Sequence, residues 1–158
     1  MPIDSSSKHH PTARPVNNSI LLVEDHALDL ELTLIALRRA GMDGNLTVMR
    51  DGQDALGYLK CNNRFADREP GNPSLVILDL ATAKLSGLEL LQAIRECALL
   101  QDVPVVVLTN SRDPAAKQKA HDLQVSSYIV KPLALEDFVA AVSKLGVLQA
   151  ATRYRAQL

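Results

Sequence analysis

The sequence predicts one domain of the three-layer α/β/α class, with a five-stranded parallel sheet between two layers of helices. Five short apolar runs alternate along the chain with five segments of helical character, which is the order expected of parallel strands joined by helical crossovers. The first of these runs, at 19–23, is continuous up to Glu24, as expected of a strand covered on both faces. With 158 residues and 47% hydrophobic composition, the chain is long enough to fill one core of this kind.

The first strand and helix follow a polar N-terminal segment. Residues 1–18 are rich in Ser, Pro, Asn and His and are expected to form a disordered tail. The apolar run at 19–23 predicts a strand. Residues 28–34 alternate like a half-exposed strand, but the pattern continues to two arginines and Gly41, which favours a helix over 27–40.

The second strand and helix precede an unusual loop. Residues 45–49 predict a short strand, and residues 51–60 predict a helix. The polar segment 62–73 contains a glycine and two prolines and is long for a connection between a helix and a strand.

The rest of the domain repeats the alternation of strand and helix. Strands are predicted at 74–78, 103–108 and 126–130, and helices at 86–97, 114–123 and 134–145. Asp113 is the expected N-cap of the fourth helix, with Pro114 as its first residue, whereas Ala134 is a poor cap for the fifth. The domain is therefore expected to span 19–146, with 147–158 as a C-terminal extension too short for a second domain.

Composition excludes several functions. The 17 basic residues nearly balance the 18 acidic ones, so no general basic field favours nucleic acid or an anionic membrane as partner. Cys61 and Cys97 lack the spacing of a zinc site or a redox motif, and we expect reduced thiols. The chain shows no secretory apolar segment and no apolar run long enough to span a bilayer, so a cytoplasmic protein is expected.

Charged and hydroxyl side chains follow the predicted strands at the points where these end. Glu24 and Asp25 follow the first strand, Asp79 the third, Thr109 the fourth and Lys131 the fifth. The carboxyl ends of the strands in an open α/β sheet form one rim, and ligands bind there. The sequence therefore predicts three carboxylates, a hydroxyl and an ammonium in one site.

Three neighbouring carboxylates repel one another unless a cation is present. Their hard oxygen ligands favour Mg²⁺, with Mn²⁺ as a substitute. Once charge is offset, Asp79 can attack a phosphoryl group while Lys131 and Thr109 hold two of the phosphoryl oxygens. These residues thus predict magnesium-dependent phosphorylation of Asp79.

Four segments resemble, in order and spacing, the response-regulator receiver domains of two-component signalling, the CheY-like superfamily: ILLVEDH, LVILDL, VVVLTN and SYIVKPL. The resemblance covers about residues 19–146 and implies a flavodoxin-like sheet with strand order 2-1-3-4-5. It implies that Asp79 is the phosphoacceptor. It further implies that Glu24, Asp25, Asp79 and the backbone carbonyl of Ala81 bind the metal.

The same resemblance assigns a switch region and partners. Thr109 and Lys131 would sense the phosphoryl group, and Tyr128 would be the aromatic switch that turns inward when Thr109 moves. The peptide bond between Lys131 and Pro132 is expected in cis. A sensor histidine kinase would donate the phosphoryl group to a signalling protein that is not an enzyme and has no DNA-binding output domain and no membrane partner.

Some positions depart from the family pattern or indicate a subgroup. Ala83 stands where a proline is usual and Ser86 where an acidic residue is usual, which puts the rigidity of the loop in question. Ala81 and Asn110 stand where the family tunes the lifetime of the phosphoryl group. The loop at 62–73 and the segments NSRDP and LEDF resemble stand-alone regulators that serve phytochrome-type kinases. Such regulators are often homodimers, and the leucine-rich first helix and Val147-Leu148 would supply apolar surface for pairing.

Other classes share parts of the pattern. A phosphatase of the haloacid dehalogenase class has its general acid two residues after the nucleophile, where this chain has Ala81. A flavodoxin-type carrier needs a phosphate loop after the first strand, where Glu24 and Asp25 would repel phosphate. A pseudo-receiver that acts by protein contact without phosphorylation stays open because of the unusual turn.

Each site residue also has an ordinary structural explanation when it is taken singly. Asp25 could cap the first helix, and Asp79 could cap a turn. Thr109 could be a satisfied hydroxyl at a strand end, Lys131 a solvated cation and Tyr128 a core residue.

Overall fold

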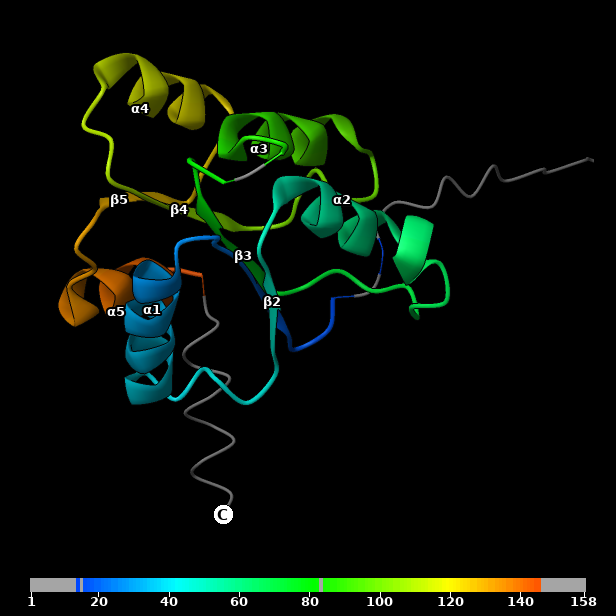
Figure 1. The fold of residues 1–158 in the computed structure, drawn as a ribbon, viewed down its shortest axis with the longest axis horizontal. Helices are drawn as coiled ribbons and strands as arrows, with labels where there is room; N and C mark the ends of the chain where they lie inside the picture. Colours follow the sequence, from blue (N-terminus) through cyan, green and yellow to red (C-terminus); the bar gives the residue numbers. More distant parts are fainter. Residues whose placement is uncertain (1–13, 15, 83, 146–158) are drawn as a thin grey trace, which may run out of the picture.

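The computed structural model describes residues 14, 16–82 and 84–145 of the chain, and in this part strands and helices alternate (Figure 1). The strands are β1 (Ile20–Val23), β2 (Leu46–Met49), β3 (Leu75–Asp79), β4 (Val105–Thr109) and β5 (Ser127–Val130). The helices are α1 (Ala27–Arg39), α2 (Gly52–Lys60), α3 (Gly87–Glu96), α4 (Pro114–Asp122) and α5 (Leu135–Ser143), with a 3-10 turn η1 (Asn63–Phe65).

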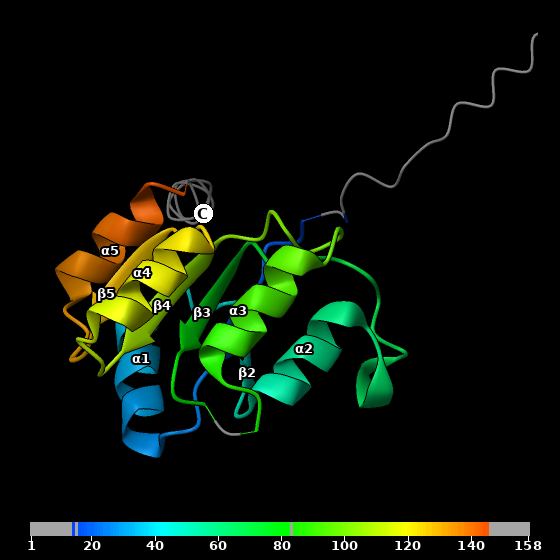
Figure 2. The same cartoon turned by 90° about the horizontal axis from the view of Figure 1, so that it is seen from above.

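The strands form one parallel sheet in the order β2-β1-β3-β4-β5. Helices α1 and α5 cover one face of the sheet, and α2, α3 and α4 cover the other (Figure 2). This arrangement confirms the predicted three-layer fold and its strand order. It also places β1 and β3, which carry the acidic residues, at the centre of the sheet.

The two helix layers explain why the apolar run of a central strand is continuous. In β3, Val76 and Leu78 pack under α2, α3 and α4, whereas Leu75 and Ile77 pack under α1 and α5. All four side chains are fully buried. Successive residues of a strand point to opposite faces, so a strand covered on both faces needs an apolar residue at every position.

Helix α1 ends in the way its sequence predicts. Gly41 has a φ of 71°, and its N–H donates to the Arg38 carbonyl at 3.0 Å, while the N–H of Met42 donates to the Leu37 carbonyl at 2.8 Å. These two hydrogen bonds form a Schellman motif, in which glycine takes the left-handed position at no steric penalty. Leu37 and Met42, on either side of this motif, are buried in the same core cluster. The segment is therefore a capped helix packed on the core, despite its alternating pattern.

The other two cap predictions are also confirmed. Asp113 caps α4 and accepts a hydrogen bond from the Ala115 N–H at 3.0 Å, with Pro114 as the first helical residue. Ala134 precedes α5 and makes no side-chain capping bond. Two strands run one residue further than predicted, because Asp79 pairs with Leu108 within the sheet ladder and Thr109 pairs with Val130.

Described contacts begin before the predicted domain boundary at residue 19. Val16 forms an isolated bridge with Asn72, and the Asn17 N–H donates to the Asn72 carbonyl at 2.9 Å. The loop at 62–73, predicted to be irregular, contains η1, and its Phe65 ring packs edge-on against Tyr58 of α2 at 5.5 Å between centroids. These contacts hold the loop against α2.

Parts of the predicted organisation lie outside the described residues. They are most of the N-terminal tail (1–13 and 15), Ala83, and the C-terminal segment 146–158 with Val147 and Leu148. Among the residues that are described, no helix has both the length and the apolar composition needed to cross a lipid bilayer.

Candidate functional site

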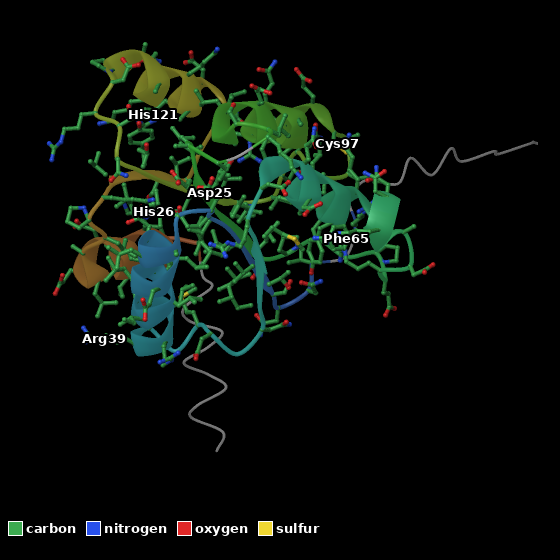
Figure 3. The ribbon with its side chains drawn as sticks, in the orientation of Figure 1. Asp25, His26, Arg39, Phe65, Cys97 and His121 are labelled. Carbon is green, nitrogen blue, oxygen red and sulfur yellow. The ribbon has the colours of Figure 1, made fainter. Side chains whose placement is uncertain are left out.

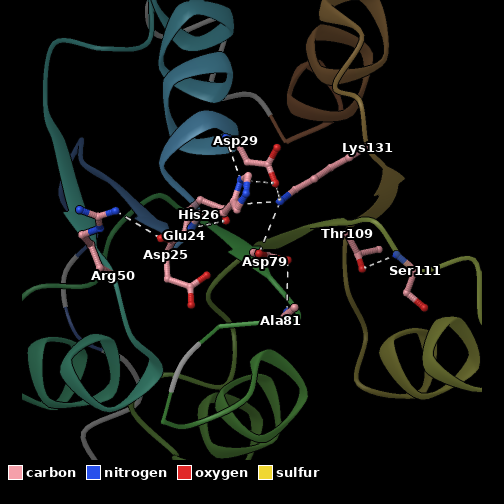
Figure 4. A network of polar contacts seen from close by, with 10 residues as sticks. All are labelled: Glu24, Asp25, His26, Asp29, Arg50, Asp79, Ala81, Thr109, Ser111 and Lys131. Atoms are coloured by element: carbon pink, nitrogen blue, oxygen red, sulfur yellow. Dashed lines mark hydrogen bonds and ion pairs between the residues drawn. The ribbon is translucent and has the colours of Figure 1, made fainter.

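The carboxyl ends of β1, β3, β4 and β5 meet at one rim of the sheet, and all five residues predicted from the strand ends lie there (Figure 4). Asp79 is the last residue of β3, and Glu24 follows β1, its neighbour in the sheet. Both carboxylates are buried, with 5% and 1% of the residue exposed, respectively. Asp25 is half-buried at the junction between β1 and α1 (Figure 3). The sheet therefore fixes two of the three carboxylates inside the protein.

These three carboxylates fit a divalent cation. One oxygen from each of Glu24, Asp25 and Asp79 lies within 4.8 Å of the others. Two oxygens bound to one Mg²⁺ are about 3 to 4 Å apart, because each lies about 2.1 Å from the ion. Small side-chain movements would therefore let all three oxygens bind the same ion. The backbone N–H of Ala81 donates to Asp79 Oδ1 at 3.2 Å, which places the Ala81 main chain beside this carboxylate.

Lys131 brings the counter-charge to this cluster. Its Nζ lies 2.8 Å from Glu24 Oε2, 2.8 Å from Asp29 Oδ2 and 3.4 Å from Asp79 Oδ2. Only 6% of the lysine side chain is exposed. The peptide bond between Lys131 and Pro132 is cis, as predicted. The ammonium is thus enclosed by carboxylates from the residue after β1, from β3 and from α1.

Enclosure of these charges shifts their titration. Burial raises the pKa of the Glu24 carboxyl to about 7, and neighbouring Asp79 adds to the rise, although the hydrogen bond from Lys131 opposes it. Burial alone would lower the pKa of the Lys131 ammonium, but its hydrogen bonds to Asp29 and Glu24 outweigh burial and raise it. The cluster holds more negative than positive charge, which a divalent cation would offset.

Thr109 and Tyr128 meet at the loop between β4 and α4. Thr109 is 2% exposed, and its Oγ1 accepts a hydrogen bond from the Ser111 N–H at 3.0 Å. Tyr128 lies on β5 next to Val107 of β4, and its hydroxyl donates to the Ser111 carbonyl at 3.2 Å. The two residues predicted to form a switch therefore share one bonding partner, Ser111, which the sequence prediction did not include.

The first turn of α1 supplies residues that the sequence prediction missed. His26, not Asp25, caps α1, because its side chain accepts a hydrogen bond from the Asp29 N–H at 3.4 Å. The His26 N–H in turn donates to Glu24 Oε1 at 3.2 Å. The Asp25 carbonyl accepts a hydrogen bond from the Arg50 side chain at 3.2 Å. Asp25 therefore keeps its carboxylate free of capping.

The loop after Asp79 is braced by its neighbours although it lacks the usual proline. The Thr82 hydroxyl donates to the Leu85 carbonyl at 3.1 Å, and Lys84 Nζ lies 3.6 Å from Asp51 Oδ2 of the α2 cap. Gly52 packs so closely on this loop that a Cβ there would collide with the Leu85 carbonyl oxygen. The described part of the loop is thus fixed against the start of α2.

Ser86 also has a structural role in place of the usual acidic residue. It is the N-cap of α3, and its side chain accepts a hydrogen bond from the Glu89 N–H at 3.2 Å. Serine is among the preferred residues at this position, so the change from the family pattern keeps the start of the helix satisfied.

This parallel sheet and the acidic cluster at its rim, with a lysine followed by a cis proline, define a receiver domain of the CheY-like class. The family comparison agrees. The chain belongs to the response regulator receiver domain family, whose model matches residues 20–143.

Two curated relatives are similar over most of their length. The probable methanogenesis regulatory protein FilR2 of Methanothrix harundinacea is 37% identical over 129 residues, which is 80% of this chain and 79% of that protein. Response regulator Rcp1 of Synechocystis sp. is 34% identical over 123 residues, covering 78% of this chain and 82% of Rcp1.

Solved structures of response regulators are similar as well. The bacteriophytochrome response regulator RtBRR superposes with a TM-score of 0.74 at 42% identity, covering 88% of this chain and 91% of RtBRR. The phosphorylated cyanobacterial phytochrome response regulator RcpA superposes with a TM-score of 0.68 at 32% identity, covering 81% of this chain and 90% of RcpA. The Mn²⁺-bound form of Rcp1 gives 0.68 at 32% identity, with 81% and 91% coverage.

Proposed function

We propose that this chain is a single-domain response regulator whose Asp79 accepts a phosphoryl group from a sensor histidine kinase in a Mg²⁺-dependent reaction. One observation carries the proposal: the buried Lys131 ammonium and the carboxylates of Glu24 and Asp25 converge on Asp79 at the carboxyl end of the central strand β3. A buried cluster of this composition has little structural value by itself, because removing charges from water is unfavourable. Phosphoryl transfer to Asp79 would explain why the chain keeps this cluster.

The residues divide the work of the transfer. An Asp79 oxygen would bond to phosphorus as the bond from phosphorus to the kinase imidazole nitrogen breaks and the imidazole leaves. Bound Mg²⁺, held by Glu24, Asp25 and Asp79, would supply positive charge against the incoming phosphoryl oxygens. Lys131 would neutralise a second oxygen, and the Thr109 hydroxyl would leave Ser111 to donate to a third.

The relatives support this proposal. RcpA is described as phosphorylated and Rcp1 as Mn²⁺-bound, and both are similar to this chain over most of its length. The three carboxylates present here offer the oxygen ligands that Mn²⁺ and Mg²⁺ both accept. We extend the two properties to this chain because its site has the groups that they need.

The output and partners follow from the surface. Similarity to bacteriophytochrome response regulators favours a phytochrome-type kinase as the phosphoryl donor. Helix α1 exposes three large apolar side chains one turn apart: Leu28 (59%), Leu32 (47%) and Ile35 (39%). Such a stripe is typical of a surface that binds a protein, and we propose that it pairs two copies in a homodimer. The signal would leave through that pairing or through the surface near Tyr128.

Intact-mass measurement after incubation with acetyl phosphate tests the proposed phosphorylation. Wild type should gain the mass of one phosphoryl group with Mg²⁺ and none with EDTA, whereas Asp79→Asn should gain none because the amide is no nucleophile. Asp67→Asn, the same change at an exposed loop position, is the matched control and should behave as wild type. A phosphorylation-independent adaptor would show no Mg²⁺-dependent gain in any variant.

A further inference from the structure

We propose that Asp29 is a positioning residue that restrains Lys131, drawing its ammonium away from Asp79 and thereby weakening the affinity of the site for a phosphoryl group. The inference rests on the proposed function, because it concerns the same site. Asp29 does not belong to the residues predicted from the strand ends. It lies in the first turn of α1, and its carboxylate points toward the Lys131 ammonium (Figure 4).

The contacts of the lysine carry the first step. Lys131 Nζ donates hydrogen bonds to Glu24 Oε2 and Asp29 Oδ2, both at 2.8 Å, while Asp79 Oδ2 is further away at 3.4 Å. An ammonium has three N–H donors in fixed tetrahedral directions. Two of them are already committed to carboxylates other than the phosphoacceptor. The Lys131 ammonium therefore binds Glu24 and Asp29 more closely than it binds Asp79.

Burial makes the Asp29 contact strong, and capping holds it in place. The side chains of Lys131 and Asp29 are 6% and 19% exposed, so solvent screens their attraction only weakly. The Asp29 N–H donates to the His26 cap, which fixes Asp29 within the first turn of α1. The carboxylate is thus presented to the ammonium by a helix end and not by a flexible loop.

Charge gives the direction of the effect. The site holds Glu24, Asp25, Asp29 and Asp79 against one lysine, and each carboxylate opposes the approach of an anionic phosphoryl group. Glu24 holds Lys131 at the same distance as Asp29 does, so the lysine stays in the site without Asp29. Removal of the Asp29 charge should therefore release the ammonium toward the phosphoryl oxygens and lower the repulsion at once.

The surroundings leave room for this exchange. Asp29 and Lys131 line a surface cavity together with Leu32, Thr33 and Asn110. The Asp29 carboxylate, whose Oδ2 also lies 3.3 Å from His26 Nδ1, borders this open space, so an uncharged side chain of the same size fits in its place.

Binding of beryllofluoride, a non-covalent mimic of the phosphoryl group, tests the inference. Amide signals are followed by nuclear magnetic resonance as beryllofluoride is titrated with Mg²⁺ present. Asp29→Asn should lower the half-saturating concentration about three- to tenfold, since one nearby negative charge is removed. Asp29→Glu, which keeps the charge, should return toward wild type. Glu31→Gln removes the same charge from an exposed position on α1 and should change nothing.

The initial rate of phosphorylation by acetyl phosphate should rise in Asp29→Asn in the same proportion. Thermal unfolding of each variant without Mg²⁺ shows whether it is folded, and Asp29→Ser replaces Asp29→Asn if the amide variant is not. Half-saturation of Asp29→Asn equal to that of Glu31→Gln would overturn the inference. Weaker binding would overturn it too, because Asp29 would then be needed to aim the lysine. If wild type itself neither binds beryllofluoride nor gains a phosphoryl group, the proposed function fails and this inference falls with it.

Discussion

At the scale of single residues, Lys131 has two roles, and both depend on its positive charge. Its ammonium lies within 3.4 Å of carboxylate oxygens of Glu24, Asp29 and Asp79, so it compensates their mutual repulsion. It is also the group that we propose neutralises the phosphoryl oxygen. A residue that holds the folded site together and takes part in its chemistry can be tested by stability as well as by phosphorylation.

Lys131→Met should lower the free energy of unfolding by about 3 kcal/mol without metal, since it leaves buried carboxylates without their counter-charge. Added Mg²⁺ should then stabilise the variant more than it stabilises wild type, because the ion would replace the missing positive charge. Urea unfolding with EDTA and with Mg²⁺ measures both effects. Lys117→Met, at an exposed position on α4, is the control. Equal Mg²⁺ stabilisation of Lys131→Met and wild type would argue against a metal at this cluster.

The site residues at strand ends could be predicted from the sequence, whereas Asp29, which lies on a helix, was missed. Asp79, Thr109 and Lys131 could be found because every strand of a parallel sheet ends at the same rim. Asp29 lies four residues beyond Asp25, and its contact with Lys131 depends on how α1 is turned about its axis. A signal was present, because side chains in a first helical turn point back toward the helix start. That start lies at the site.

At the scale of elements, α2 braces the loop that follows the phosphoacceptor. Gly52, the first residue of α2, packs against the Leu85 backbone, and the Asp51 cap pairs with Lys84. The family pattern uses a proline to stiffen this loop, whereas this chain has Ala83. The close approach of α2 offers another way to hold the described part of this loop, and the loop sequence alone could not reveal it.

Gly52→Ala should destabilise the protein by about 2 kcal/mol, because the new methyl group meets a backbone carbonyl that cannot move aside without moving the loop. Gly44→Ala places the same methyl group where no atom lies within 4 Å and should change stability by less than about 0.5 kcal/mol. Urea unfolding measures both. Equal stability of the two variants would show that the loop moves aside at no cost in free energy. The conclusion that α2 braces the loop would then be wrong.

Strand and helix boundaries show the limit of pattern reading at this scale. Apolar runs located every strand, but they stop at the first polar residue, whereas Asp79 and Thr109 still pair within the sheet. The hydrogen-bond ladder depends on the backbone and accepts a polar side chain at its end. For α1 the caps decided between helix and strand, and Gly41 was the residue that resolved the alternating pattern.

At the scale of the whole molecule, the alternation of strand and helix specified the fold, but it gave no information on assembly. Parallel strands need crossovers, and right-handed crossovers restrict the arrangements that a chain of alternating elements can adopt. The pairing that we propose depends instead on a few exposed side chains of α1. Leucines on this helix are divided by the helical period between a buried face with Leu37 and an exposed face with Leu28 and Leu32. The exposed face is the one available to a second copy.

Leu32→Asp should shift wild-type dimers toward monomers, because a charge at the centre of an apolar contact would be buried without a partner. Light scattering coupled to size exclusion, over a range of protein concentrations, measures the molar mass of each form. Val16→Asp introduces the same charge at a side chain that is 70% exposed and whose backbone forms the bridge with Asn72, outside α1, so it should leave the dimer intact. Far-ultraviolet circular dichroism checks that both variants are folded. A wild type that stays monomeric at every concentration, or a Leu32→Asp variant that stays dimeric, would exclude the α1 face as the pairing surface and leave it free for a different protein.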